Sequence, residues 1–268
     1  MAIGQPAGAS TTTASHNYAA ARAAAIATLK HLMVGQHATN HRVGVPDVRT
    51  PALTQDQSTN WSGYADDNTS GNTYSKITGK WTEPAVTCTS TTAIAVFWVG
   101  IDGFTSNTVE QDGTLAECSG GSAFYFTWWE MFPSNNIQVV GSTVAPGDKI
   151  AASVIKSGTK YALKVTDSTN TANSFTTTQT CAATTCVDSS AEWIAEAPSG
   201  SAGLFPLPNF KTWRLTSATV KSGTTLGKIF SFPDDEITMV NSSSQVKAQP
   251  GPLNATGNAF TVTWKRST

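Results

Sequence analysis

Histidine is absent from the sequence beyond position 41, since the only four are His16, His31, His37 and His41. The rest of the chain therefore cannot hold a Ser-His-Asp or Cys-His catalytic arrangement, or a zinc site built on histidine. Any acid-base chemistry there falls to carboxylates, amides, hydroxyls and water. The segregation also divides the chain into a histidine-bearing leader and a body without imidazole.

Charged residues are scarce as well. They make up 13% of the chain, against roughly 25% in an average soluble protein, and Ser, Thr, Asn and Gly fill the polar positions. Residues 1–57 hold four basic and two acidic residues, a net of +2, and the remainder holds 13 and 16, a net of −3. Neither part is charged enough to indicate nucleic-acid binding. Polarity without ionisation suits an extracellular protein, including one exposed to unusual pH.

Long apolar runs are missing too. No stretch approaches the roughly 20 apolar residues of a membrane span, so we expect no membrane partner. The N-terminus also lacks the charged and apolar regions of a signal peptide. Because the cysteines described next indicate secretion, we expect that a native signal was trimmed and Met1 added.

Four cysteines lie in the body, at Cys88, Cys118, Cys181 and Cys186. Their even number, without histidine nearby, favours disulfides over a metal site. We expect Cys181–Cys186 to close a small loop and Cys88–Cys118 to tie two strand ends together. Four free buried thiols are the alternative. No metal or other cofactor is expected.

The leader is predicted to contain one helix. Residues 1–15 are expected to be disordered and residues 34–58 to form an extended linker. Between them, residues 16–33 are rich in alanine, which favours a helix, and have apolar residues at spacings of three and four. The predicted stripe consists of Tyr18, Arg22, Ile26, Leu29 and Met33.

From Asn60 onward, short alternating runs are separated by Gly, Asn, Asp and Pro turns, which predicts an all-β sandwich. No second helix of any length is expected. The predicted strands are 60–66, 73–83, 94–102, 122–132, 136–140, 148–156, 159–167, 190–197, 213–220, 236–241 and 258–265.

Two predicted strands carry acidic residues beside aromatic ones. Alternation puts Phe124, Phe126, Trp128 and Glu130 on one face of their strand. The opposite face carries Tyr125, Thr127, Trp129 and Met131, so the strand either has two core faces or lines a cleft with one of them. Glu130 favours the cleft, because a buried carboxylate is costly without a partner.

The run Ser190–Pro198 puts Glu192, Ile194 and Glu196 on one face. From spacing alone, a solvated face is the better interpretation of these two carboxylates. Farther upstream, the run Phe97–Gly103 aligns Trp98 with Asp102.

Five short motifs then occur in a definite order. They are Asn60-Trp-Ser-Gly63, Trp98-Val-Gly-Ile-Asp-Gly103, Gln111-Asp-Gly113, Trp129-Glu-x-x-Pro133 and Ala191-Glu-Trp-Ile-x-Glu196. In this order and spacing, and through to Phe260–Trp264, the body resembles the glutamic peptidases, also called eqolisins. Each motif alone is weak, but five in order are specific.

The resemblance implies a lectin-like, concanavalin A-like sandwich of two antiparallel sheets, one bent into a substrate groove. It also implies a secreted acid endopeptidase, insensitive to pepstatin, made as a precursor with an N-terminal propeptide. The family's catalytic residues correspond to Gln111 and Glu192. Residues expected in or near the substrate site are Trp61, Trp98, Asp102, Trp128 and Glu130.

Such a dyad works without imidazole. Glu192 would take a proton from the attacking water, and Gln111 would stabilise the developing oxyanion and hold the water. A segment between Asp102 and Gln111 one residue shorter than in fungal members, cysteines at other positions, and Glu110 beside the glutamine indicate a bacterial-type branch.

Rival interpretations use the same residues. A glycoside hydrolase or lectin would pair Glu130 with Glu192 and stack Trp98 or Trp128 on sugar, and a non-catalytic binding module would use neither carboxylate. An aspartic peptidase is excluded, because the sequence has neither Asp-Thr-Gly nor Asp-Ser-Gly.

We therefore expect residues 1–58 to be a propeptide and residues 59–268 a peptidase domain, monomeric, with protein or peptide substrates and its own propeptide as partners. Protonation of His31, His37 and His41 in acid, together with neutralisation of the carboxylates they face, is expected to loosen the basic leader from the groove.

Overall fold

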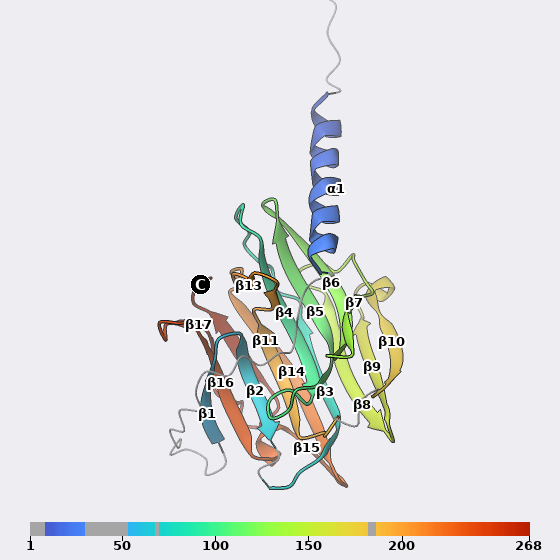
Figure 1. Cartoon of the computed structure of the whole chain (residues 1–268), viewed down its shortest axis with the longest axis vertical. Coiled ribbons are helices and arrows are strands. Elements are labelled where there is room, and N and C mark those ends of the chain that lie inside the picture. The colour runs from blue at the N-terminus through green and yellow to red at the C-terminus, as the bar shows by residue number, and fades with distance from the viewer. Residues whose placement is uncertain (1–8, 30–52, 68–69, 182–185) are drawn as a thin grey trace, which may run out of the picture.

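The computed structural model describes residues 9–29, 53–67, 70–181 and 186–268. In these residues, antiparallel strands form two layers packed face to face, and one helix stands at an end of the sandwich (Figure 1). The predicted all-β sandwich with a preceding helix is therefore confirmed. Beyond α1, the only helical segments described are two short 3-10 turns, Thr171–Asn173 and Ile229–Ser231.

The large sheet extends from the C-terminal strand, β18, to β7, and β1 pairs in parallel with β16. In spatial order the large sheet consists of β18 (Phe260–Trp264), β17 (Val246–Pro250), β16 (Asp234–Val240), β2 (Trp61–Asp67), β11 (Ser190–Glu196), β4 (Ala93–Ile101), β5 (Val109–Ser119), β6 (Ser122–Phe132) and β7 (Asn135–Val139), with β1 (Leu53–Ser58) against β16.

The small sheet covers one face of the large sheet. It consists of β10 (Phe175–Thr180), β9 (Lys160–Asp167), β8 (Lys149–Ser157), β3 (Tyr74–Thr82), β14 (Thr212–Ser222) and β15 (Thr225–Gly227). A separate two-stranded ribbon is formed by β12 (Ser199–Gly200) and β13 (Gly203–Leu204).

Strand β14 joins the two sheets. Its first part, Thr212–Leu215, pairs with β18, and from Thr216 onward it pairs with β3, with a register shift between Thr216 and Thr219. Ser217 within this shift has φ 56°, so the bulge bends the strand from one layer into the other. The sandwich is thus one hydrogen-bonded path folded over at β14.

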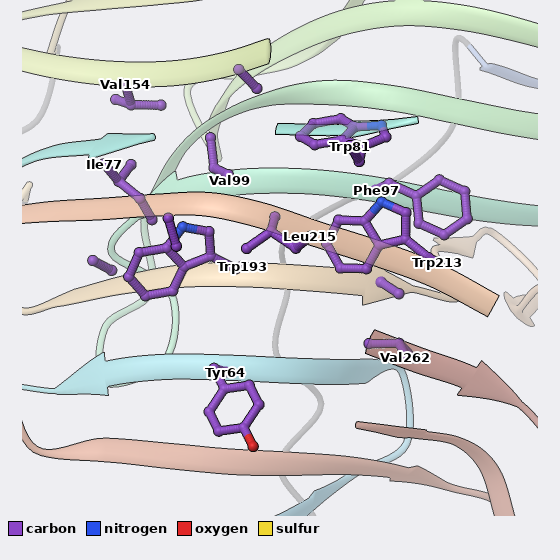
Figure 2. Close-up of a cluster of buried hydrophobic side chains, with 14 of the residues drawn as sticks. Tyr64, Ile77, Trp81, Phe97, Val99, Val154, Trp193, Trp213, Leu215 and Val262 are labelled. Atoms are coloured by element: carbon purple, nitrogen blue, oxygen red, sulfur yellow. The ribbon is translucent and has the colours of Figure 1, made fainter. Parts of the chain in front are cut away.

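The core between the sheets is aromatic. Figure 2 shows Trp81, Phe97 and Trp213 gathered at one end of this layer and Ile77 and Trp193 at the other. The rings of Phe97 and Trp213 stack with centroids 5.4 Å apart. Because strand side chains alternate between faces, the neighbours of these residues point away from the core, to the outside of each sheet.

The outer face of the large sheet is called the site face here. Its apolar residues form a second buried cluster that includes Trp61, Trp98, Phe126, Trp128 and Ile194. Phe126 and Trp128 thus lie on the face opposite to Trp129 and Met131, which pack against the core between the sheets. The alternation predicted for this strand is confirmed, with a different apolar cluster on each face.

Helix α1 (Ala9–Leu29) begins earlier than predicted. Residues 9–15 were expected to be disordered but are helical. They are mostly Ser and Thr, which favour a helix less than alanine, so the helix extends into them from the alanine-rich turns that follow. Of the predicted stripe, Leu29 is buried, whereas Ile26 is 37% exposed and Ala25 is buried instead. Met33 lies outside the described residues. Arg22 donates to the carbonyl and hydroxyl of Ser142. The helix contacts β5 and β6 on the site face.

Several strands were missed. β1 lies in the segment predicted as an extended linker, and its six residues pair with Asp234–Met239 of β16. β5 begins with Val-Glu-Gln-Asp-Gly, and Glu, Asp and Gly are depleted in strands. β10, β12, β13, β15 and β17 were missed as well. Tertiary pairing overrides weak local propensity at the start of β5, whereas β10 is rich in Thr, which favours strands.

Both expected disulfides are present, Cys88–Cys118 and Cys181–Cys186. The first disulfide ties the segment that precedes β4 to the end of β5, and the second closes a loop before β11. None of the described helices is long and apolar enough to cross a membrane. In the same residues, no group of three or more His, Cys, Asp and Glu is placed to hold a metal ion.

Candidate active site

One row of residues crosses the site face on six neighbouring strands. Strand register sets Ala65 opposite Asp235 and Glu192, Gly100 opposite Glu192 and Gln111, and Gln111 opposite Glu130. In order across the sheet, the row reads Asp235, Ala65, Glu192, Gly100, Gln111 and Glu130. Because paired residues point to the same side of a sheet, three of the predicted site residues share one line.

Gly100 opens a gap in this row. Glu192 and Gln111 lie two strands apart, about 9.5 Å between backbones, and the strand between them carries no side chain at this level. A Cβ added to Gly100 would lie 2.8 Å from Cζ3 of Trp98 and 3.2 Å from Cγ1 of Val109. The Trp98 ring and Val109 thus lie against Gly100, and Glu192 and Gln111 flank it in the row.

Glu192 has one anchored and one unpartnered oxygen. Its Oε1 accepts from the backbone N–H of Phe104 at 3.3 Å, and the Ser190 hydroxyl also bonds to the carboxyl. Oε2 is buried without a hydrogen-bond partner in the described residues. Burial raises the pKa of the Glu192 carboxyl well above its ordinary value, and the Ser190 bond offsets part of this effect.

Gln111 is oriented by Glu130. The Gln111 amide nitrogen Nε2 donates to Oε2 of Glu130 at 2.9 Å, and burial raises the pKa of Glu130 well above its usual range. The Gln111 carbonyl oxygen Oε1 is buried and has no partner among the residues described. One further N–H of the amide is left over, because the side-chain NH2 has two donors.

The next row places aromatic rings beside this gap. Trp98 lies opposite Ile194 and Gly113, and Trp128 lies opposite Gly113 on the other side. Trp98 Nε1 donates to Oε2 of Glu196 at 2.9 Å. The ring of Trp61 meets Trp98 edge to face, with centroids 5.0 Å apart.

Glu192 and Glu196 are both fully buried, with 0% of their surfaces exposed. The interpretation of these carboxylates as a solvated face was therefore wrong. Spacing identified the shared face correctly, but it carried no information on what covers that face.

Asp102 faces a different neighbour from the other predicted site residues. It follows β4 with φ 68°, and its carboxylate accepts the N–H groups of Asp188 and Ser189 at 2.9 and 2.7 Å. The Ser189 hydroxyl donates to it as well. Asp102 thus holds the segment that leads into β11, three and four residues before Glu192, and fixes the entry of that strand.

The sequence pattern missed the supports of Glu192. The Phe104 N–H lies in the turn after Asp102, and no sequence signal locates it. Ser190 is two residues from Glu192 on the same strand face, a spacing that would have identified it. Glu196, which holds Trp98, was seen only as part of the supposed solvated face.

The geometry does not favour a glycosidase pair. Glu130 and Glu192 lie three strands apart, about 14 Å between backbones, with Gln111 and Gly100 between them in the row. Paired carboxyl groups of glycosidases are about 5–9.5 Å apart. Glu130 is moreover bound to Gln111.

The three histidines of the predicted acid switch, His31, His37 and His41, lie outside the described residues.

Comparison with known proteins identifies the family. The model of the Peptidase A4 family matches residues 59–263. Aspergillopepsin-2 of Aspergillus niger is 26% identical over 234 residues, which cover 78% of this chain and 79% of that protein.

Solved structures share the fold. Scytalido-glutamic peptidase bound to a peptide-based transition state analog has a TM-score of 0.63 at 19% identity, covering 77% of this chain and 98% of that one. Aspergilloglutamic peptidase from Aspergillus niger has a TM-score of 0.56 at 24% identity, covering 65% and 99%. The chain therefore belongs to the Peptidase A4 family, the glutamic peptidases or eqolisins, and is a peptide-bond hydrolase.

Proposed function

We propose that this chain is the secreted, monomeric precursor of an acid endopeptidase, in which Glu192 is the general base and Gln111 stabilises the oxyanion. The observation that carries this proposal is the pair of buried, unpartnered oxygens, Glu192 Oε2 and Gln111 Oε1, on either side of Gly100. A water between them would donate one hydrogen bond to each oxygen. Both bonds orient its lone pair toward a substrate carbonyl.

The chemistry needs only these groups. The water oxygen bonds to the scissile carbonyl carbon while Glu192 takes one of its protons. The carbonyl electron pair moves to its oxygen, where the spare N–H of Gln111 stabilises the negative charge. Glu192 then gives its proton to the amide nitrogen, the C–N bond breaks, and the amine leaves. Glu130 holds the Gln111 amide in its orientation throughout.

Burial in the whole chain keeps Glu192 inactive as a base. Its pKa is raised well above 4.5, mainly by loss of solvent, so the carboxyl is protonated in acid. Opening the site to water would lower that pKa toward about 4.3. Glu192 would then be partly ionised near pH 4. Gln111 and Glu192 are both 0% exposed, so a protein substrate also needs this opening to reach them.

The leader is proposed as the segment whose loosening in acid opens the site, and self-cleavage then removes it. Residues 1–58 form the propeptide in this proposal, and cleavage falls between about Pro46 and Asn60. A cut before Leu53 would leave β1 paired with β16, and a cut after Ser58 would release it. Helix α1 contributes Ala25 and Leu29 to the buried cluster on the site face, which supports a leader that rests on the catalytic layer.

Acidification is expected to convert the 28.1 kDa chain to a shorter form by self-cleavage. Gel electrophoresis after transfer to pH 4 measures the conversion, and N-terminal sequencing locates the cut relative to β1. Glu192→Ala is expected to stay at full length, since it lacks the base. Conversion of purified Glu192→Ala with no other protease present would refute self-processing.

The proposed activity is tested most directly by incubating the acid-treated protein with casein and with β-glucan at pH 4, in the presence of pepstatin. Casein is expected to be cleaved and β-glucan left intact. Cleavage of glucan without proteolysis would support the glycosidase alternative and reject the endopeptidase.

Gly100→Ala is expected to lower kcat/KM for casein by about tenfold or more. The new methyl group would lie over the gap between Glu192 and Gln111 and press on the Trp98 ring at 2.8 Å. Displacing reacting groups by about 1 Å costs on the order of 100-fold in catalysis. Gly251→Ala is the matched control, because its Cβ would meet only the Thr261 side chain closely, at 3.0 Å. Equal activity of both variants would argue against a reaction at Gly100.

A further inference from the structure

The outer face of the small sheet, called the back face here, is strongly basic. The positions that point outward on β3, β8, β9, β10 and β14 carry Lys, Arg, Thr, Ser, Ala and one Ile, and no acidic residue. The basic residues of the back face are Lys76, Lys80, Lys149, Lys160, Lys164, Arg214 and Lys221. Seven of the chain's 17 Lys and Arg residues thus point outward on one side of the sandwich.

No carboxylate in the described residues neutralises these charges. Sixteen of the 17 Asp and Glu residues in the described part of the chain are buried, and the other, Glu236, is half-buried and accepts from Tyr64. Lys149 donates only to the Thr82 hydroxyl. The one ion pair found among the described residues joins Lys156 and Asp188, and neither residue belongs to the back face.

Like charges also face each other on this surface. Register sets Lys76 of β3 directly opposite Lys221 of β14, and such a pair is destabilising in a sheet. Nothing in the described chain compensates for this cost. An external anion would compensate for it.

The back face is hollowed where three of its basic residues line one depression. A depression of about 720 Å³ is lined by Lys80, Lys149 and Arg214, with the hydroxyl residues Thr82, Thr166, Ser168, Thr212 and Thr216 around them. Glu83 also borders it, but that side chain is 1% exposed and bonded to Thr114 and Trp81 inside the sandwich. Ammonium, guanidinium and hydroxyl groups together suit an anionic, hydroxyl-rich ligand.

The composition of the face narrows the class of polyanion. It carries no outward aromatic ring on which bases of a single-stranded nucleic acid would stack. Its one large apolar side chain, Ile155 at 40% exposure, gives no apolar surface for a lipid interface. A partner met in acid must also keep its charge there, which sulfate esters do and carboxylates near pH 4 do only in part. This last step rests on the proposed acid function.

We propose that the back face binds a sulfated polysaccharide, with the hollow at Lys80, Lys149 and Arg214 as its centre. The sulfates pair with the three cations, and the surrounding hydroxyls hydrogen-bond the sugar. The site face lies on the other layer of the sandwich, so the bound polymer does not cover it. The enzyme would thereby be retained on a sulfated matrix while it cleaves protein.

The test measures binding of the 268-residue chain to dextran sulfate at pH 4, with uncharged dextran and double-stranded DNA as comparison probes. All seven basic residues follow position 59, so leader removal would not affect the result. The variant Lys80→Gln/Lys149→Gln/Arg214→Gln is expected to bind at least tenfold more weakly, with a shallower dependence of affinity on salt concentration. The matched control Lys228→Gln/Lys265→Gln/Arg266→Gln removes the same charge elsewhere and is expected to stay within about twofold.

Equal losses in both triple variants would overturn the proposal, because binding would then follow net charge rather than this face. So would wild-type binding to DNA as tight as to dextran sulfate, or no binding to dextran sulfate above that to dextran. Casein cleavage by both triple variants is expected to match the wild type. Loss of binding with intact cleavage therefore separates the back face from the proposed catalytic function.

Discussion

Glu192→Gln is expected to lower kcat/KM for casein at pH 4 by about 10⁴-fold, measured on leader-free protein. The replacement keeps the size of the side chain and an oxygen to accept from Phe104 N–H. It removes the only group in the row Glu192–Gly100–Gln111 that can take a proton from water. Loss of a general base costs about 10²–10⁴-fold, and units that share one proton transfer show the larger losses.

Gln111→Ala is expected to cost less, about 10²–10³-fold, as for removal of one oxyanion donor. Because the expected losses of kcat/KM differ in size, they distinguish the general base from the oxyanion donor. Binding should change little in Glu192→Gln, so kcat should fall while KM stays nearly constant.

Glu117→Gln is the matched control for Glu192→Gln. Glu117 is a buried glutamate on the site face, three alternate positions along β5 from Gln111. The kcat/KM of Glu117→Gln for casein is expected to stay within about threefold of the wild-type value. If Glu192→Gln retained a tenth or more of wild-type kcat/KM, or lost no more than Glu117→Gln, the general base would have to be another group.

The sequence contained enough to place part of this site. Ser119-Gly120-Gly121-Ser122 is a two-residue hairpin signal, and both glycines have positive φ, 56° and 81°. The Ser119↔Ser122 pair sets the register that places Gln111 opposite Glu130. The polar start of β5, Val-Glu-Gln-Asp-Gly, conceals the strand that precedes this hairpin.

Other features could not be predicted from one sequence. Long-range pairing brings β11 between β2 and β4, and no local pattern specifies which distant strand lies beside Glu192. The burial of Glu192 and Glu196 likewise depends on what covers the site face. Strand alternation predicted which side chains share a face, and the tertiary structure determines whether that face is exposed to solvent.

The same burial extends to nearly all acidic residues and predicts how stability depends on pH. Burial raises the pKa of Glu83 to about 8, that of Glu117 to about 8 and that of Asp234 to about 7. Asp66, Asp112 and Glu130 are shifted in the same direction, chiefly by burial. Each of these carboxyl groups binds its proton more tightly in the folded protein than in the unfolded chain.

The sign of the effect follows from proton linkage. Between the unfolded pKa of about 4 and the folded pKa, the folded state holds more protons, so raising the pH lowers the free energy of unfolding. Stability is therefore full below about pH 4 and declines up to about pH 8. Burial lowers the pKa of Lys247 to about 8, and this group changes stability only above that range.

We expect the melting temperature of the full-length chain to be at least about 20 °C lower at pH 8 than at pH 4. Each pKa unit corresponds to about 1.4 kcal/mol, so three such carboxyls amount to on the order of 10 kcal/mol. That is comparable with the whole stability of a domain, and 1 kcal/mol shifts the melting temperature by about 2–4 °C at this size. Differential scanning calorimetry across this pH range measures it.

Glu83→Gln tests the cause of this decline. Glutamine imitates the protonated carboxyl and keeps an acceptor for Thr114 and Trp81, so the variant is expected to match the wild type at pH 4 and to melt higher at pH 8. A wild-type melting temperature that stays level or rises from pH 4 to pH 8 would contradict the linkage argument. Nearly all the described acids are buried, whereas Lys247 is the only described base that is, so this protein is expected to be most stable in acid.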